Sequence, residues 1–377
     1  MDFNYSNEQT ALRDTLQRFI DREYDFERRR ELAQSVLGYS AEGWARFAEF
    51  GLLSLPFPEE FGGFGGKTVD IMLVMELIGR GLLLEPYSST VVMCGGLIRD
   101  AGSPSVKQSL LPRIGTGEIK LALACYEASA RYDLAQVNCT AASGGGGWRL
   151  TGQKTVVLDA PSADYFLVSA RSGAGDAREI SVFLVGREAQ GVSLLAYPTQ
   201  SGGRAGDLRL DDVWVGPDAL IGAPGEGLDI VERAVDLGAA ALCAEAVGII
   251  AALNEATLNY LKTRKQFGVP IGKFQALQHR MADMFIAAEQ ARSMAILAAV
   301  YADSADAAER RRSVSAAKAY IGQAGRLVGQ QSVQLHGAMG VVDDVIVSHY
   351  FKRLTMIELT LGDTDFHLGR FAATLMS

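Results

Sequence analysis

A basic and aromatic string in the last third of the chain has the residue types of a site for an anionic cofactor. It runs from Arg264 to Gln275 and reads Arg-Lys-Gln-Phe-Gly-Val-Pro-Ile-Gly-Lys-Phe-Gln. A guanidinium can hold a phosphate through parallel charge-assisted hydrogen bonds. An arginine at a helix C-terminus can also simply complement the helix dipole, which is worth ~0.3–1 kcal/mol. That simpler interpretation covers one basic residue and leaves the rest of the string unexplained.

A second string, from Val333 to Gly340, reads Val-Gln-Leu-His-Gly-Ala-Met-Gly. Small residues in such a segment allow another chain or a cofactor to approach the backbone closely.

A glycine-rich segment at residues 56–66 invites a phosphate-loop interpretation, because Lys67 and Thr68 follow it. That motif requires glycine at position 61, where this chain has Phe61. The prolines and glycines of the segment stop a helix, so we interpret it as a structural turn.

Other kinds of site are not indicated. The four cysteines are far apart with no CxxC pair, and the four histidines form no HExxH pattern, which argues against a disulfide framework or a zinc site. The net charge is −8 and no half of the chain is strongly basic, which argues against a nucleic-acid surface.

The elements that must position the strings follow from the apolar pattern, which changes twice along the chain. Residues 1–117 show helical spacing, residues 118–225 contain short β-forming runs, and residues 226–377 return to long helical periods. The order predicts an α+β protein with an N-terminal helical domain, a middle β-barrel or sandwich, and a C-terminal helical bundle. The bundle helices are expected at 227–264, 274–303, 307–337 and from 344 onward, the strands at 120–125, 148–150, 155–158, 165–170 and 180–184, and the glycine-rich turns at 143–147 and 172–176.

The longest apolar run, from Gly238 to Leu253, contains Glu245 and is short for a membrane span. We expect it to lie inside the bundle, with Ile249 and Leu253 buried. The first ten residues are polar and acidic, unlike a signal peptide, so a cytoplasmic location is expected.

The two strings resemble the C-terminal domain of the acyl-CoA dehydrogenase family, which typically reads Arg-x-x-Phe-Gly, then Phe-Gln-x-x-Gln, then Gln-x-His-Gly-Gly-x-Gly. The matching segments here are Arg264–Gly268, Phe274–Gln278 and Gln334–Gly340, with Ala338 in place of the second glycine of the last motif. The segments 58–63, 150–154 with 163–164, and 210–215 resemble other parts of the family. The similarity extends in order over essentially the whole length.

The resemblance implies an N-terminal helical domain, a middle β-barrel, a C-terminal four-helix bundle and an FAD enzyme. The flavin N5 takes a hydride from Cβ of an acyl-CoA, and a glutamate takes the proton from Cα. In the family, the arginine and the Gln-x-His-Gly segment hold the ADP half of the neighbouring subunit's FAD. Carried over to this chain, these family roles imply that Arg264 binds the pyrophosphate, that Phe267 packs on the cofactor, and that Gln334 lies at the adenine end. The implied cofactor-binding residues are Arg264, Gln266, Phe267, Gln334, Leu335 and Gly337.

The positions that contact the flavin ring in the family differ in this chain. The family's Thr-Glu-Pro-Gly-Ala-Gly-Ser-Asp is replaced at 126–133 by Tyr-Glu-Ala-Ser-Ala-Arg-Tyr-Asp. The family's Trp-Ile-Thr-Asn is replaced by Val156-Val157-Leu158-Asp159. An aromatic wall and a hydroxyl donor are therefore lost, because neither valine nor leucine supplies them.

The family's proton acceptor has no counterpart at either of its common positions. Leu361 stands before Gly362, and Gly238 stands about 26 residues before the arginine. Glu245 is two helical turns from Gly238, a separation of about 10 Å, and is interpreted as a polar partner to a neighbouring helix. The catalytic residue is therefore unknown. The other acidic residues nearby are Asp236, Glu358, Asp363 and Asp365.

Some family enzymes are heterotetramers of two diverged subunits, of which one keeps the flavin-ring pocket and the base and the other keeps the ADP-contacting strings. This chain is most similar to the second kind, in particular to small subunits of pimeloyl-CoA dehydrogenase type. The expected partners are an acyl-CoA from fatty-acid or steroid side-chain oxidation, a second dehydrogenase-like subunit and an electron-transfer flavoprotein-type acceptor. A self-sufficient homotetrameric dehydrogenase with a relocated base, and a non-catalytic acyl-CoA-binding or scaffold protein, stay open as alternatives.

Overall fold

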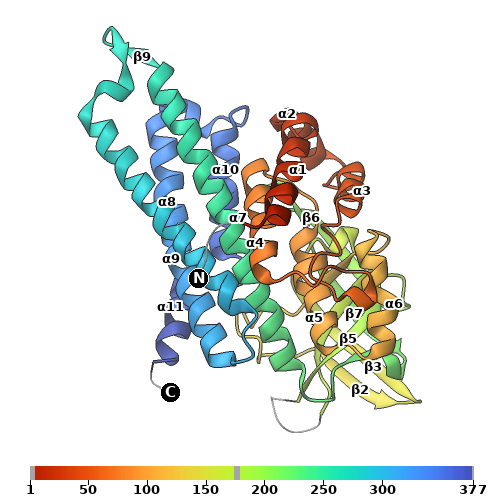
Figure 1. Ribbon diagram of the computed structural model, residues 1–377. Helices are drawn as coiled ribbons and strands as arrows, with labels where there is room; N and C mark the ends of the chain where they lie inside the picture. The colour runs from red at the N-terminus through yellow and green to blue at the C-terminus, as the bar shows by residue number, and fades with distance from the viewer. Residues whose placement is uncertain (1–4, 174–178, 376–377) are drawn as a thin grey trace. The chain divides into compact units, whose positions relative to one another are not determined.

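The computed structural model describes residues 5–173 and 179–375 (Figure 1). Most of the turn expected at 172–176 lies outside the described residues. The chain forms two compact units. The first combines the described parts of residues 1–29, 68–83 and 239–377, and the second comprises residues 30–67 and 84–238.

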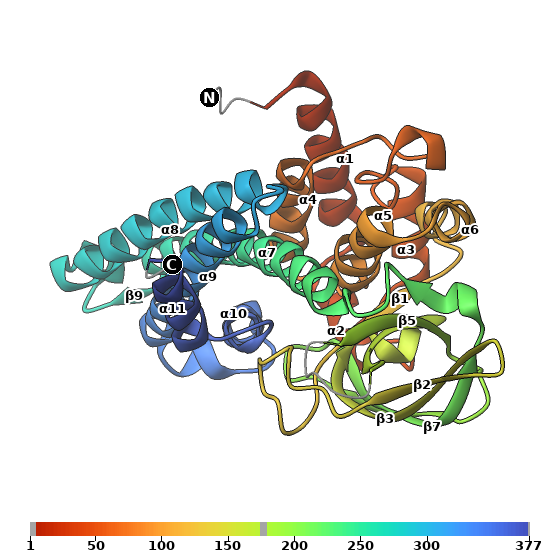
Figure 2. The ribbon, with the colours of Figure 1, turned by 90° about the horizontal axis from the view of Figure 1, so that it is seen from below.

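The first unit is helical. In it α8 and α9 lie side by side along their length (Figures 1 and 2). A capping box starts α1, because the Ser6 and Gln9 side chains bond each other's backbone N–H. The helices of this unit are α1 (Asn7–Glu23), α4 (Thr68–Gly81), α7 (Gly227–Thr263), which begins in the second unit, α8 (Gln275–Ala302), α9 (Ala307–His336), α10 (Ile346–Leu359) and α11 (Thr364–Ala373), while α2 (Phe26–Gln34) straddles the division.

Helices α4 and α7 cross in very close contact at two glycines. A Cβ atom at Gly79 would lie 2.0 Å from the Glu245 carbonyl oxygen, and one at Gly248 would lie 1.8 Å from the Glu76 carbonyl oxygen. Only glycine allows backbones to approach in this way. The crossing lies within the apolar run, where Ile249 and Leu253 are fully buried as predicted.

Helix α7 is long and apolar enough to pass a membrane-span test, but 94% of the apolar window is buried in the structure. That burial is typical of a core helix of a globular protein.

The second unit contains α3 (Ala41–Glu49), α5 (Gly96–Ala101), α6 (Pro104–Gly115), a π-helical segment Ser88–Gly95 and an eight-stranded sheet. The strands curve around one another (Figure 2). The sheet order is β6-β7-β3-β2-β4-β5-β8, with β1 parallel to β4. The strands are β1 (Leu121–Ala124), β2 (Thr140–Gly144), β3 (Gly147–Leu158), β4 (Tyr165–Arg171), β5 (Ile180–Gly186), β6 (Val192–Pro198), β7 (Arg204–Val215) and β8 (Leu220–Ile221).

The glycine run at 143–147 forms the predicted hairpin turn between β2 and β3. Gly145 and Gly146 both have positive φ, +61° and +78°, which suits a two-residue turn. The structural interpretation of residues 56–66 is also confirmed, because a Cβ at Gly63 would lie 2.0 Å from the Phe57 carbonyl oxygen.

Two expectations about the elements were wrong. The runs 148–150 and 155–158 belong to one strand, β3, which is irregular where it pairs with β7 between Leu150 and Val157. The expected single helix from 344 onward is two helices, α10 and α11, because Leu361 (φ +58°) and Gly362 (φ +111°) reverse the chain. Asp363 then caps α11 by accepting the Phe366 N–H. The predicted fold class, with N-terminal helices, a middle β sheet and C-terminal helices, is confirmed.

Candidate cofactor-binding site

The string that begins at Arg264 forms a small hairpin where α7 ends and α8 begins (Figure 1). Two short strands, β9 (Lys265–Gln266) and β10 (Val269–Pro270), pair antiparallel across Phe267 and Gly268. Both turn residues have positive φ, +53° and +79°, so the backbone has the twist of a tight β-hairpin. The turn leaves the Phe267 side chain 89% exposed at the tip.

Arg264 is anchored by its backbone and is free at its side chain. Its N–H donates to the Tyr260 carbonyl (2.8 Å) and its carbonyl accepts from the Ile271 N–H (2.9 Å). The guanidinium is exposed and has no hydrogen bond or ion pair to any residue that the structure describes. A fixed backbone with an unpaired cation is suited to binding an anion.

Several apolar side chains near the hairpin are exposed. The Phe267 ring meets the Phe274 ring edge-to-face, with centroids 6.1 Å apart, and Phe285 and Ile286 on α8 are 61% and 53% exposed. Gln266 is exposed as well. Phe267, Phe274, Phe285 and Ile286 are therefore accessible from solvent in the chain by itself.

The second string lies at the C-terminus of α9. Gln334 is exposed, the Leu335 side chain is buried, and Gly337 has φ +60° with open space where a side chain would stand. Leu335 can therefore offer a ligand only its backbone, whereas Gln334 and Gly337 can be reached directly.

A stacked pair of rings brings the two strings to the same end of the bundle. His336 stacks on Tyr260, four residues before Arg264, with ring centroids 4.4 Å apart. Its Nδ1 lies 2.8 Å from the Ser332 carbonyl, so Nδ1 carries the proton and donates. Burial lowers the pKa of His336, so the ring is neutral at pH 7. The sequence motif includes this histidine, but nothing in it indicated the stacking.

Neither base position supplies a carboxylate, and four of the five acidic residues nearby have other partners. Glu245 accepts two hydrogen bonds from Arg353 of α10, at 2.5 and 2.7 Å, which confirms it as a partner to a neighbouring helix. Glu358 accepts from Arg326 and from the Thr364 N–H, both at 3.3 Å. Asp363 caps α11, Asp365 is exposed, and Asp236 is buried in α7 with partners of its own.

In the middle domain, the one glutamate shared with the family motif is committed to the domain itself. Glu127 accepts from the Lys154 ammonium (2.8 Å) and from the N–H groups of Asn138 and Cys139. Lys154 is fully buried and also donates to Ser169. Burial raises the pKa of the Glu127 carboxyl, but the bonds from Lys154 and the backbone outweigh it and hold that pKa below its usual range.

The segment that replaces the family's ring-contacting tetrapeptide is strained. Val156 is 55% exposed with φ +52°, a conformation that β-branched residues rarely adopt. Its N–H donates to Asp207, which also accepts from the Tyr197 hydroxyl. The backbone of this segment is therefore held in an unfavourable conformation by its surroundings, including the bond from the Val156 N–H to Asp207.

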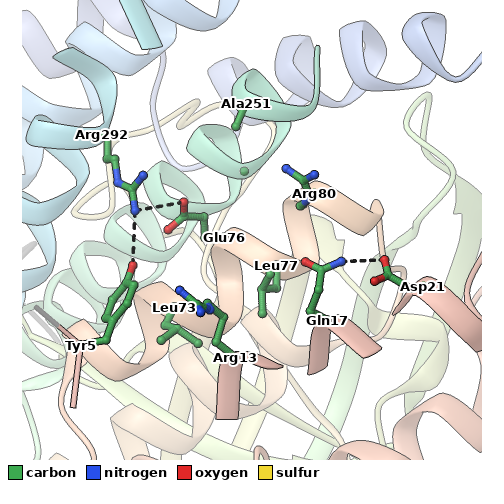
Figure 3. A pocket seen from close by; sticks show the side chains of 11 residues that line it. Tyr5, Arg13, Gln17, Asp21, Leu73, Glu76, Leu77, Arg80, Ala251 and Arg292 are labelled. Atoms are coloured by element: carbon green, nitrogen blue, oxygen red, sulfur yellow. Dashed lines mark hydrogen bonds and ion pairs between the residues drawn. The ribbon is translucent and has the colours of Figure 1, made fainter. Parts of the chain in front are cut away.

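A hollow of about 520 Å³ in the first unit lies apart from these residues (Figure 3). Helices α1, α4, α7 and α8 line it. Its charges are paired locally: Arg292 lies 4.0 Å from Glu76 and donates to Tyr5, and Arg80 pairs with Glu255 at 2.7 Å. None of the predicted cofactor residues lines it.

Comparison with known proteins agrees with this architecture. The chain matches the acyl-CoA dehydrogenase N-terminal domain over residues 6–118, the middle domain over 122–213 and the C-terminal domain over 225–376. The chain belongs to the acyl-CoA dehydrogenase family, whose members are FAD-dependent oxidoreductases.

Individual relatives cover nearly the whole chain. Acyl-CoA dehydrogenase FadE27 of Mycobacterium tuberculosis is 29% identical, with 100% of this chain and 99% of that protein covered. A chain of the ChsE4–ChsE5 complex from the same organism superposes with a TM-score of 0.90 at 29% identity, covering 100% and 99%. A chain of a Tcur3481–Tcur3483 steroid ACAD variant gives 0.88 at 30% identity, covering 98% of each.

FAD is the family's cofactor, and the two strings fit its ADP half. The unpaired Arg264 suits a pyrophosphate, Phe267 offers an exposed aromatic face, and Gly337 leaves its backbone open. The ring-contacting segment offers no comparable groups, because the Val156 N–H is taken by Asp207 and Leu158 has no donor side chain.

Proposed function

We propose that this chain is the subunit of a heteromeric acyl-CoA dehydrogenase that lacks the usual base and contributes the ADP-contacting residues of FAD. The partner subunit then supplies the ring pocket and the glutamate for α,β-dehydrogenation of an acyl-CoA thioester. Arg264, Gln266, Phe267, Gln334, the Leu335 backbone and Gly337 hold the cofactor.

One observation carries this proposal: the unpaired, exposed Arg264 lies at the same end of the bundle as Gln334 and Gly337, whereas no carboxylate stands at position 361 or 238. The solved relatives named as ChsE4–ChsE5 and Tcur3481–Tcur3483 complexes support a two-chain assembly, and the naming of the second as a steroid ACAD favours a steroid-derived acyl group. These are properties of those proteins, which we extend to this chain by analogy.

Three further points belong to the proposal. The evolutionary divisions of the chain are residues 1–117, 118–225 and 226–377. The assembly works in the cytoplasm, and it passes electrons to an acceptor of the electron-transfer flavoprotein type.

The experiment removes the unpaired cation. Arg264→Ala in the assembled complex is expected to weaken FAD binding roughly 10- to 100-fold, since a charged hydrogen bond is worth about 1.5–3 kcal/mol. Equilibrium FAD affinity, measured by flavin fluorescence after removal and titration of the cofactor, reports the effect.

Lys262→Ala is the matched control, because Lys262 is an exposed cation in the last turn of the same helix. It should change FAD affinity less than about threefold, as a general electrostatic effect would. If Arg264→Ala and the parent complex bind FAD with equal affinity, Arg264 is only a charge at the end of a helix, and the proposed binding site is wrong.

A further inference from the structure

Lys318 of α9 is a buried cation whose hydrogen bonds within the described residues go to backbone oxygens. It is 1% exposed, and its ammonium donates to the carbonyls of Gly362 (2.7 Å) and Glu358 (3.1 Å). Both carbonyls belong to the end of α10 and the turn that follows it. A cation there also complements the negative end of the α10 dipole.

His367 of α11 holds the same turn from its other side. Its Nε2 lies 3.0 Å from the Leu361 carbonyl and its Nδ1 lies 3.2 Å from the Ser315 hydroxyl. Since a carbonyl only accepts, Nε2 carries the proton and Nδ1 accepts from Ser315. Burial, and next the neighbouring Lys318 charge, lower the pKa of His367 to about 3, so this tautomer is the neutral ring.

The turn needs such support because its backbone is unusual. Leu361 has φ +58°, a conformation that is unfavourable for a non-glycine residue, and the turn is closed by side chains that reach in from α9 and α11. Ordinary helix ends leave their last carbonyls to water or to a glycine cap.

We propose that Lys318 and His367 are positioning residues that fix the Leu361–Gly362 turn, and with it the side chain at position 361. Position 361 is where the resemblance places the proton-accepting glutamate of related enzymes. Because the bonds of the pair go to backbone carbonyls, they fix the backbone at that position, where this chain carries Leu361. This role goes beyond the proposed function, because it concerns the backbone of the Leu361–Gly362 turn and not the binding of FAD.

The first test measures hydrogen exchange of the amides that flank the turn, those of Thr360, Thr364 and Phe366. All three are hydrogen-bonded in the structure. His367→Leu leaves the buried Leu361 carbonyl without a donor, and exchange of these amides should accelerate roughly tenfold. His367→Gln keeps a donor amide and should restore exchange to within about threefold of the parent. Amides of α8 are the internal reference and should not change.

The second test uses pH. The groups that face this cluster are Cys243 of α7, Glu358 of α10, Asp363 of the turn, and His367 and Arg370 of α11. Burial lowers the pKa of Lys318 to about 8, from 10.5, so an opening that wets the ammonium takes up protons. Opening should therefore become rarer by roughly tenfold between pH 7.5 and 9.5 in the parent, after correction for intrinsic exchange. Lys318→Met should lack this dependence.

Three results would overturn the inference: turn exchange in His367→Leu equal to the parent, an acceleration shared equally by α8, or a pH dependence that persists in Lys318→Met. If Lys318→Met does not fold, the His367 pair decides alone. FAD affinity of the Arg264→Ala complex tests the proposed function separately, so the failure of one does not imply the failure of the other.

Discussion

The hairpin between α7 and α8 and the β3 segment of the middle domain both match stretches that contact FAD in the family, yet they differ in how their polar groups are satisfied. At the hairpin, the Arg264 guanidinium has no partner in the described chain and Phe267 is 89% exposed. In the β3 segment, Lys154 and Glu127 bond each other inside the domain, and the Val156 N–H is taken by Asp207. The hairpin thus leaves its basic and aromatic groups exposed, whereas these polar groups of the β3 segment have partners within the middle domain.

The largest expected effect comes from removing the buried ion pair between Lys154 and Glu127 in the middle domain. Lys154→Met leaves Glu127 buried without its counter-charge, which should lower the free energy of unfolding by about 3–5 kcal/mol. Urea unfolding followed by circular dichroism measures it. Arg149→Met is the control in the same strand, since the Arg149–Asp212 pair is exposed and should contribute no more than ~1 kcal/mol. Similar losses in both variants would show that burial of the pair does not matter.

A pH experiment examines the same pair from the carboxylate side. The folded-state pKa of Glu127 lies below its ordinary 4.5, so the unfolded chain binds more protons just below that pH. This contribution to stability is present above pH 4.5 and is lost as the pH falls through the folded-state pKa. Chemical unfolding from pH 6 to pH 3 should therefore show a steeper loss for the parent than for Glu127→Gln. Parallel curves would contradict a depressed pKa.

The smallest expected effect concerns Phe267, the exposed aromatic residue at the tip of the hairpin. Phe267→Ala removes a side chain that touches little of its own chain, so the free energy of unfolding should change by less than about 0.5 kcal/mol. FAD retention in the assembled complex should nevertheless fall roughly 2- to 10-fold, the value of one aromatic contact. Stability and retention measured on one preparation separate the two effects. A large stability loss without weaker retention would make Phe267 a structural residue.

The sequence predicted the long helices of the bundle closely, because their apolar period runs over 28 to 37 residues and their ends carry turn residues. It also placed a turn between α7 and α8, but it did not indicate the two short strands β9 and β10. The α10–α11 break was missed, since Leu361 at positive φ has no local signature and is held by Lys318 and His367. The bond between Glu127 and Lys154 joins residues 27 positions apart, which periodicity does not show.

In the proposed assembly, this chain holds the ADP half of FAD for a partner and does not complete a flavin site alone. Flavin content and acyl-CoA dehydrogenation, measured on the chain purified alone and on the chain co-expressed with a second dehydrogenase-like chain, test it most directly. The partner should carry the Trp-x-Thr hairpin and a glutamate base. We expect a nearly colourless, inactive chain alone and about one FAD per heterodimer with turnover in the complex. Stoichiometric FAD and turnover in the chain alone would contradict it.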